Sequence, residues 1–191
     1  IYITKDSTCV KMPTNIDMST VELVYVGTIN NIIDIPSIKN LIEKLSSYKK
    51  VRLSIIGNGA SKDKFIETTE AAGAEVVDYG VVYDEQIKHE IYSKSHFGLN
   101  IMKSELAVGF TQKSLDYFEA GVPIINNIPY DTKHLVDKYN CGIDLQCVLD
   151  NPALITDMSE AELLNMKIAT RKMFENVLSK ETFYKRLGDI L

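Results

Sequence analysis

The sequence predicts a doubly wound α/β fold: a Rossmann-like parallel sheet with helices on both faces, followed by C-terminal helices. From residue 21 to residue 146, short apolar runs rich in β-branched residues alternate with segments of helical periodicity. The runs are apolar throughout, as strands buried on both faces of a parallel sheet are. The links are short, which favours repeated β-α units. With 191 residues, 45% of them hydrophobic, the chain can bury a full core.

The first half of the pattern predicts three strands and two helices. Strands are expected at residues 21–27, 51–57 and 74–80. Helices are expected at residues 36–48 and 62–73. Pro36 suits the first turn of a helix, and Ile38, Leu41 and Leu45 follow it at helical spacing. Gly73 is placed to end the second helix.

The second half continues the alternation. Strands are expected at residues 97–102, 121–127 and 141–146. Helices are expected at residues 84–95, from Thr111 or Gln112 to Gly121, and at 130–140. Asp84 is expected to cap the first of these helices. The six strands then form one sheet, which would bind a ligand beyond the carboxyl ends of its strands.

The tail departs from this alternation. Ser159 and Glu162 have the spacing of a capping box and open a long helix at 159–178, with a shorter helix expected at 180–190. The chain starts "IYITKDSTCV" without an initiator methionine. We therefore expect residues 1–18 to be a linker after an N-terminal domain outside this chain. The main domain is then 19–158, and the helical tail is 159–191.

Composition narrows the class of partner. The net charge of -5 argues against nucleic acid as a partner. No apolar run approaches the ~20 residues that a membrane span needs, so at most a peripheral membrane contact and a cytoplasmic location are expected. The three histidines have no metal-ligand spacing, and we expect no metal and no cofactor.

Three strand-to-helix loops are candidates for ligand contact. Gly27 and Thr28 follow the first strand, and Gly57 and Gly59 follow the second. Tight turns alone also explain such glycines. The dinucleotide fingerprint G-x-G-x-x-G is absent, because Lys62 stands where its third glycine would be.

The third loop, "VGFTQKSLD" at 108–116, has the strongest signal. A helix that begins near Thr111 leaves its first amides unpaired, and these favour an anion. Lys113 is electrostatically unfavourable at a bare helix N-terminus, and an anionic ligand would remove that conflict. Asp116 shares a helix face with Gln112 and Lys113, where it could accept hydrogen bonds from ribose hydroxyls. The alternative is a solvated helix end with a weak Lys113–Asp116 pair.

The ordered set "VYVGTI", "LSIIGNGASKDKF" and "GFTQKSLDYFEAGVPII" resembles the C-terminal, donor-binding domain of GT-B fold glycosyltransferases, especially their family 4 of retaining enzymes. The resemblance runs from Val21 to Gln146. It implies a nucleotide-diphospho-sugar, such as a UDP-sugar, as substrate, and a sugar or lipid-linked acceptor held by the N-terminal domain. Bacterial surface polysaccharide synthesis is the corresponding family-level expectation.

The resemblance also implies roles for residues. The base would lie along residues 80–83, the diphosphate at the amides of Phe110 to Gln112 and at Lys113, and the ribose at Asp116. Lys113 would stabilise the leaving diphosphate, and no other catalytic residue is assigned. The expected nucleotide-sugar-binding residues are Gly27, Thr28, Gly57, Gly59, Val81, Val82, Gly109, Phe110, Thr111, Gln112, Lys113 and Asp116.

The chain departs from the family pattern at two points. The family has two acids eight positions apart; the second falls on Asp116, but the first falls on Val108. Glu105 is the nearest substitute and is out of register. The basic residues that usually follow the first strand are also missing. Two alternatives therefore stay open: a nucleotide-sugar epimerase of similar fold, and a catalytically degenerate nucleotide-binding or partner domain.

Overall fold

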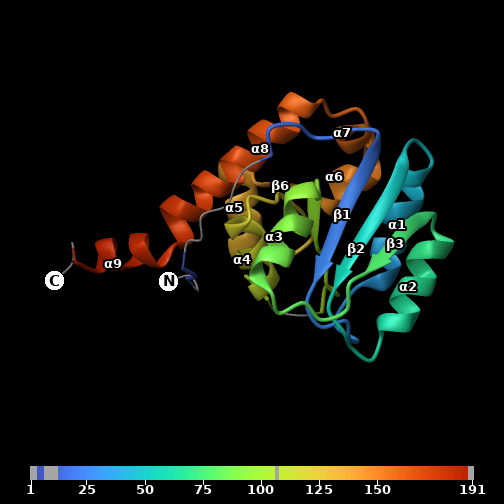
Figure 1. Ribbon diagram of the computed structural model, residues 1–191, viewed down its shortest axis with the longest axis horizontal. Helices are drawn as coiled ribbons and strands as arrows, with labels where there is room; N and C mark the ends of the chain where they lie inside the picture. Colours follow the sequence, from blue (N-terminus) through green and yellow to red (C-terminus); the bar gives the residue numbers. More distant parts are fainter. Residues whose placement is uncertain (1–3, 7–12, 106–107, 189–191) are drawn as a thin grey trace.

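The computed structural model describes residues 4–6, 13–105 and 108–188, which form a six-stranded parallel sheet (Figure 1). The strands are β1 (Thr20–Val26), β2 (Lys50–Ile56), β3 (Ala74–Asp78), β4 (Phe97–Asn100), β5 (Ile124–Asn126) and β6 (Gly142–Asp144). Their order is β3-β2-β1-β4-β5-β6. The chain therefore builds outward in one direction from β1 and in the other from β4, as in a doubly wound sheet.

Helices cover both faces of the sheet. They are α1 (Ile35–Ser46), α2 (Lys62–Ala71), α3 (Glu85–Lys94), α4 (Gln112–Glu119), α5 (Asp131–Tyr139), α6 (Leu145–Asp150), α7 (Ala153–Thr156), α8 (Glu160–Met173), the π-helical turn η1 (Phe174–Leu178) and α9 (Lys180–Gly188). Buried residues of α1, α2, α6, α7 and the start of α8 form one core with the sheet. Buried residues of α3, α4, α5 and η1 form the other core. The predicted fold class is confirmed.

The predicted helix ends are also confirmed. The Asp84 carboxylate accepts hydrogen bonds from the amides of Gln86 and Ile87 at the start of α3. Ser159 and Glu162 form the reciprocal capping box that opens α8. Each cap satisfies amides that have no partner inside the helix. Gly73 follows α2 with a φ of 102°, a conformation that glycine adopts without strain.

The last strand is shorter than the predicted strand at residues 141–146. β6 ends at Asp144, whose carboxylate accepts a hydrogen bond from the Gln146 amide and so caps α6. Leu145 and Val148 are buried on α6, which puts them in the core with α1. α6 and α7 were not predicted, because helices of this length show too little periodicity to recognise.

Strands β1 and β4 diverge toward their carboxyl ends. They pair only at Leu23 with Phe97 and at Val24 with Gly98 within the described residues. The Tyr117 hydroxyl bonds to the backbone of β1, accepting a hydrogen bond from Val26 N at 2.9 Å and donating to Val24 O at 3.1 Å. A Cβ on Gly98 would lie 2.7 Å from the Tyr117 ring, so that only glycine fits there. This divergence opens the sheet at the point where the strand order reverses.

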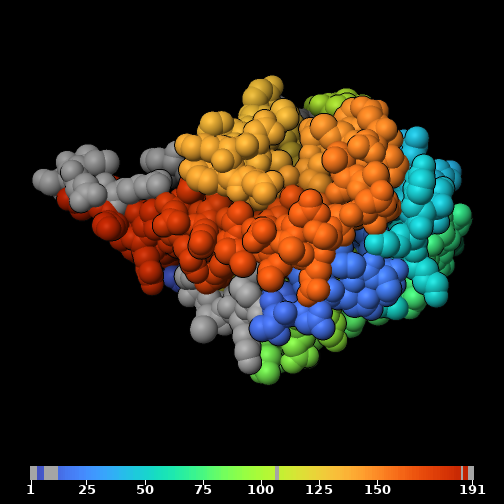
Figure 2. Space-filling view, turned by 90° about the horizontal axis from the view of Figure 1, so that it is seen from above, coloured from blue at the N-terminus to red at the C-terminus, as the bar shows by residue number. Residues whose placement is uncertain are grey.

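The C-terminal helices run across the molecule and end beside the N-terminal segment. Figure 2 shows them, orange to red, exposed along one face next to the blue residues of the N-terminal part. Residues 4–6 lie against the end of η1, where Lys5 N–H bonds to Leu178 O and Lys180 N–H bonds to Lys5 O. Within the described part of the chain, no helix is both long enough and apolar enough to cross a membrane.

Candidate functional site

The loops after β1, β2 and β3 are joined by backbone hydrogen bonds. Gly27 N–H bonds to Ile56 O at 2.9 Å, and Gly57 N–H bonds to Gly80 O at 2.7 Å. A Cβ at Gly57 would lie 2.0 Å from Gly27 O, and one at Gly59 would lie 2.2 Å from Ile29 O. Both glycines are therefore required by the close approach of two loops, whether or not a ligand binds there.

Two hollows open at this edge of the sheet. The larger, which we call the α4 pocket, has a volume of about 470 Å³. Its lining includes Thr28, Asn30, Met102, Gln112, Lys113 and Asp116. The smaller, which we call the loop pocket, has a volume of about 270 Å³. Its lining includes Gly57, Asn58, Val81, Val82 and Lys88. Val26, Gly27 and Thr28 line both hollows, so the two meet at the end of β1.

The N-terminus of α4 is fixed by a buried polar network. Thr111 caps the helix by accepting a hydrogen bond from Ser114 N. Its hydroxyl donates to Asn100 Oδ1 at 2.8 Å, and Asn100 Nδ2 donates to Asn126 Oδ1 at 2.7 Å. The Thr111 hydroxyl proton therefore points into the protein and is not available to a ligand in the α4 pocket. The network holds the first turn of α4 against the ends of β4 and β5.

Lys113 provides a half-buried cation at the start of α4. Its Nζ lies 4.7 Å from the centre of the Tyr25 ring and 3.4 Å from the Tyr25 hydroxyl oxygen. It forms no ion pair with any carboxylate in the described residues. Burial lowers the pKa of Lys113 to about 8. The amides of Gln112 and Lys113 also have no acceptor within the described chain. An anion in the α4 pocket would satisfy all three groups.

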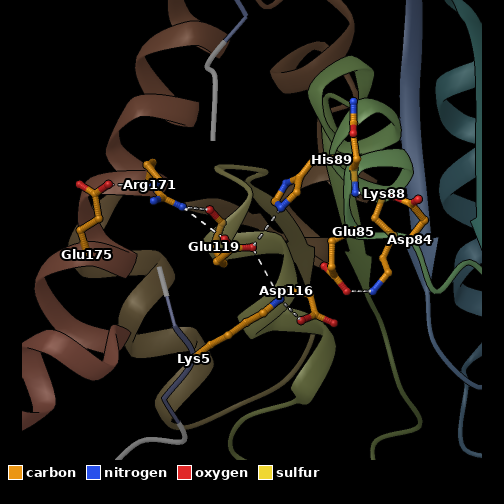
Figure 3. Close-up of polar contacts among 10 residues, drawn as sticks. Lys5, Asp84, Glu85, Lys88, His89, Asp116, Glu119, Arg171 and Glu175 are labelled. Atoms are coloured by element: carbon orange, nitrogen blue, oxygen red, sulfur yellow. Dashed lines mark hydrogen bonds and ion pairs between the residues drawn. The ribbon is translucent and has the colours of Figure 1, made fainter. Parts of the chain in front are cut away.

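Asp116, one turn along α4, does not pair with Lys113. Its Oδ1 accepts a hydrogen bond from Lys5 Nζ at 2.9 Å (Figure 3). The weak Lys113–Asp116 pair, which the sequence offered as the simpler explanation, is therefore not formed. Lys113 turns toward Tyr25 while Asp116 faces the N-terminal segment, and both line the α4 pocket.

The structure brings together nine of the twelve predicted binding residues and leaves three outside the two hollows. Gly59 is taken up in loop packing. Gly109 O accepts hydrogen bonds from Thr132 N and Oγ1. Phe110 packs on Phe118, with ring centroids 6.3 Å apart. Glu105, proposed as a substitute acid, is exposed and lines neither hollow.

Two lysines near the hollows were missed by the sequence analysis. Lys88 lines the loop pocket from α3, where it pairs with Glu85. Lys88 follows residues 80–83, which were expected to contact the base, and this nearness in sequence could have identified it as a candidate. Lys5 reaches Asp116 from 111 residues away, and no local pattern reveals such a contact. Within the described residues, no cluster of three or more His, Cys, Asp or Glu side chains could hold a metal ion.

No protein-family model matches the sequence, and a search of curated proteins also finds no match. Solved structures do match. S. aureus TarM, in a complex that contains UDP, superposes with a TM-score of 0.68 at 12% identity, over 99% of this chain and 38% of TarM. The lipopolysaccharide outer core galactosyltransferase WaaB gives 0.66 at 18% identity, over 100% of this chain and 55% of WaaB. The fold is that of a GT-B glycosyltransferase domain.

A third GT-B neighbour has a similar match. Anabaena HepE, in complex with UDP and glucose, gives a TM-score of 0.66 at 11% identity, over 90% of this chain and 48% of HepE. The chain thus spans about half or less of the length of each of these three glycosyltransferases. At identities this low the likeness shows the fold alone.

Proposed function

We propose that this GT-B domain binds the nucleotide-diphospho-sugar donor, such as a UDP-sugar, of a glycosyltransferase. The observation that carries the proposal is Lys113: a half-buried ammonium without a paired carboxylate in the described chain, beside unpaired amides of α4. These groups line a hollow at the point where the strand order reverses, which is where doubly wound sheets bind ligands. TarM and HepE, which share the fold, were solved with UDP.

The arrangement suits stabilisation of a leaving diphosphate. As the bond between sugar and diphosphate breaks, negative charge grows on the diphosphate oxygens. Lys113 and the amides of Gln112 and Lys113 are held in place before the reaction, so they can stabilise that charge with little reorganisation. Residues 80–83 would contact the base, and Asp116 the ribose. Retention of configuration and a role in cytoplasmic synthesis of bacterial surface polysaccharide belong to the same proposal.

Titration calorimetry with the 191-residue chain tests the binding step. We expect UDP and UDP-sugars to bind, uridine to bind more weakly, and inorganic phosphate to compete with UDP. The proposal would be overturned if neither UDP, nor GDP, nor their sugar derivatives bound the protein.

Turnover is a separate measurement. A near-attack geometry requires both reactants to be held, so this chain alone is expected to transfer no sugar without an acceptor-binding domain. NMR of the products made from a UDP-sugar and an acceptor by a longer form of the protein would detect transfer. Conversion of the donor to an epimer would support the epimerase instead. If neither product forms, the result would support a binding domain without turnover. Val108, which stands where the family has an acid, is consistent with that outcome.

A further inference from the structure

The carboxylate of Asp116 is held from one side only. Its side chain is 27% exposed and lines the α4 pocket. Oδ1 accepts the hydrogen bond from Lys5 at 2.9 Å, and no described residue bonds to Oδ2. A carboxylate offers about four lone-pair sites, so one ammonium leaves most of its capacity unused.

Lys5 is fixed through its backbone. Its N–H bonds to Leu178 O at 3.4 Å, and its C=O accepts from Lys180 N at 3.1 Å. The neighbouring Asp6 carboxylate pairs with Lys180 Nζ at 2.6 Å. These contacts attach residues 4–6 to the junction of η1 and α9. The Lys5 side chain therefore reaches α4 from a fixed starting point.

A second carboxylate holds the same ammonium. Lys5 Nζ lies 3.6 Å from Glu119 Oε2, one turn along α4 from Asp116 (Figure 3). Glu119 is 1% exposed and also lies 3.7 Å from Arg171 Nη1 and 3.9 Å from His89 Nε2. Burial lowers the pKa of Lys5, but its hydrogen bond to Asp116 and the two carboxylate charges outweigh burial, so the pKa is raised and Lys5 stays charged.

We infer that Lys5 is a positioning residue for the ribose of a bound nucleoside diphosphate: by binding Asp116 Oδ1, it leaves Oδ2 available to sugar hydroxyls. The inference rests on the proposed function. An aspartate without this contact would sample several rotamers, and ordering it on binding would reduce affinity. Lys5 acts through Asp116, so its effect should concern the ribose and not the phosphates.

The test compares UDP with 2′-deoxy-UDP by calorimetry on the 191-residue chain. Wild type should prefer UDP. In Lys5→Met the preference should shrink about fivefold, the upper range for a partly exposed ion pair, and Lys5→Arg should restore it. Lys39→Met is the matched control, because it removes an exposed ammonium of α1 whose partner is Glu43 and which lines neither hollow. Glu119 keeps Arg171 and His89 nearby in Lys5→Met, so that variant should fold.

A double-mutant cycle shows whether Lys5 acts through Asp116. In an Asp116→Asn background, Lys5→Met should leave the UDP to 2′-deoxy-UDP ratio unchanged. The inference would be overturned if Asp116→Asn lowered the preference for UDP over 2′-deoxy-UDP but Lys5→Met alone left it unchanged. The proposed function would still stand after that result. Tighter UDP binding by Lys5→Met would also overturn it, because Lys5 would then compete with the ribose. If wild type bound no nucleoside diphosphate, the proposed function would fail first.

Discussion

The Lys113 ammonium lies 4.7 Å above the centre of the Tyr25 ring, although Asp116 stands one turn away on the same helix. Tyr25 is a buried residue of β1, and its hydroxyl donates to Thr28 O at 2.9 Å. The ring therefore joins the start of α4 to the loop after β1. A cation held by a ring face keeps its charge available to a ligand, which a carboxylate partner would neutralise.

Replacing Lys113 should distinguish phosphate contact from base contact. We expect Lys113→Met to weaken UDP binding by about ten- to a hundredfold, the range for charge-assisted hydrogen bonds. Uridine should bind both proteins with similar affinity. The control is Lys133→Met, which removes an exposed lysine of α5 paired with Asp137. It should change neither the affinity for UDP nor the affinity for uridine. An equal loss for UDP and uridine would place the diphosphate elsewhere.

The affinity for UDP should depend on pH through Lys113. Burial lowers the pKa of this lysine to about 8, so the free protein loses the charge above that pH. A bound diphosphate raises the pKa, and affinity should therefore fall as the pH rises from about 8 to 10. Calorimetry at several pH values should show this fall in wild type and not in Lys113→Met. A fall of the same size in both proteins would assign it to another group.

Deprotonation of Lys113 should affect the free energy of unfolding in the opposite direction to its effect on affinity for UDP. An unfolded lysine keeps its proton up to its ordinary pKa of 10.5, whereas Lys113 in the folded protein loses it near pH 8. Between these values the unfolded chain binds more protons, so the contribution of Lys113 to the free energy of unfolding increases with pH. Urea unfolding of wild type and Lys113→Met across this range would measure the difference.

Asp116→Asn should affect the ribose selectively. The change keeps the shape of the side chain, removes its charge and replaces one acceptor oxygen with an NH₂ group. UDP should lose about 1–3 kcal/mol of binding free energy, and 2′-deoxy-UDP should lose less. Calorimetry with both nucleotides gives the comparison. Equal discrimination by wild type and variant would show that Asp116 does not contact the sugar.

Tyr117→Phe tests the divergence of β1 and β4 with a side chain that does not itself line the α4 pocket. The change leaves Val26 N–H and Val24 O without the hydroxyl that bonds to both. The free energy of unfolding should fall by about 1–3 kcal/mol, the cost of unsatisfied buried groups. Tyr48→Phe is the control, since Tyr48 is 71% exposed. Equal urea midpoints for the two variants would contradict this account.

Much of the fold could be predicted because its signals are local. Buried strands read as apolar runs, and the caps at Asp84, Thr111 and Ser159 lie next to the helices they open. The signal for Lys113 was also local, because a lysine in the first turn of a predicted helix can be recognised from neighbouring residues. The partner of Asp116 was not, because Lys5 is brought to it by the packing of η1 and α9. The role of the Tyr117 hydroxyl has no local signal either, because its partners Val24 and Val26 lie more than 90 residues earlier in the chain.

The contact between residues 4–6 and the end of η1 has a consequence for folding. Lys5 and Ser179 form a parallel bridge between segments separated by nearly the whole length of the chain. Closing so long a loop is entropically costly, so this contact should form late. Once formed, the two segments depend on each other and should open as one cooperative unit. Their amide protons should then exchange with solvent at a common rate, faster than those of β1 and β2 at the centre of the sheet.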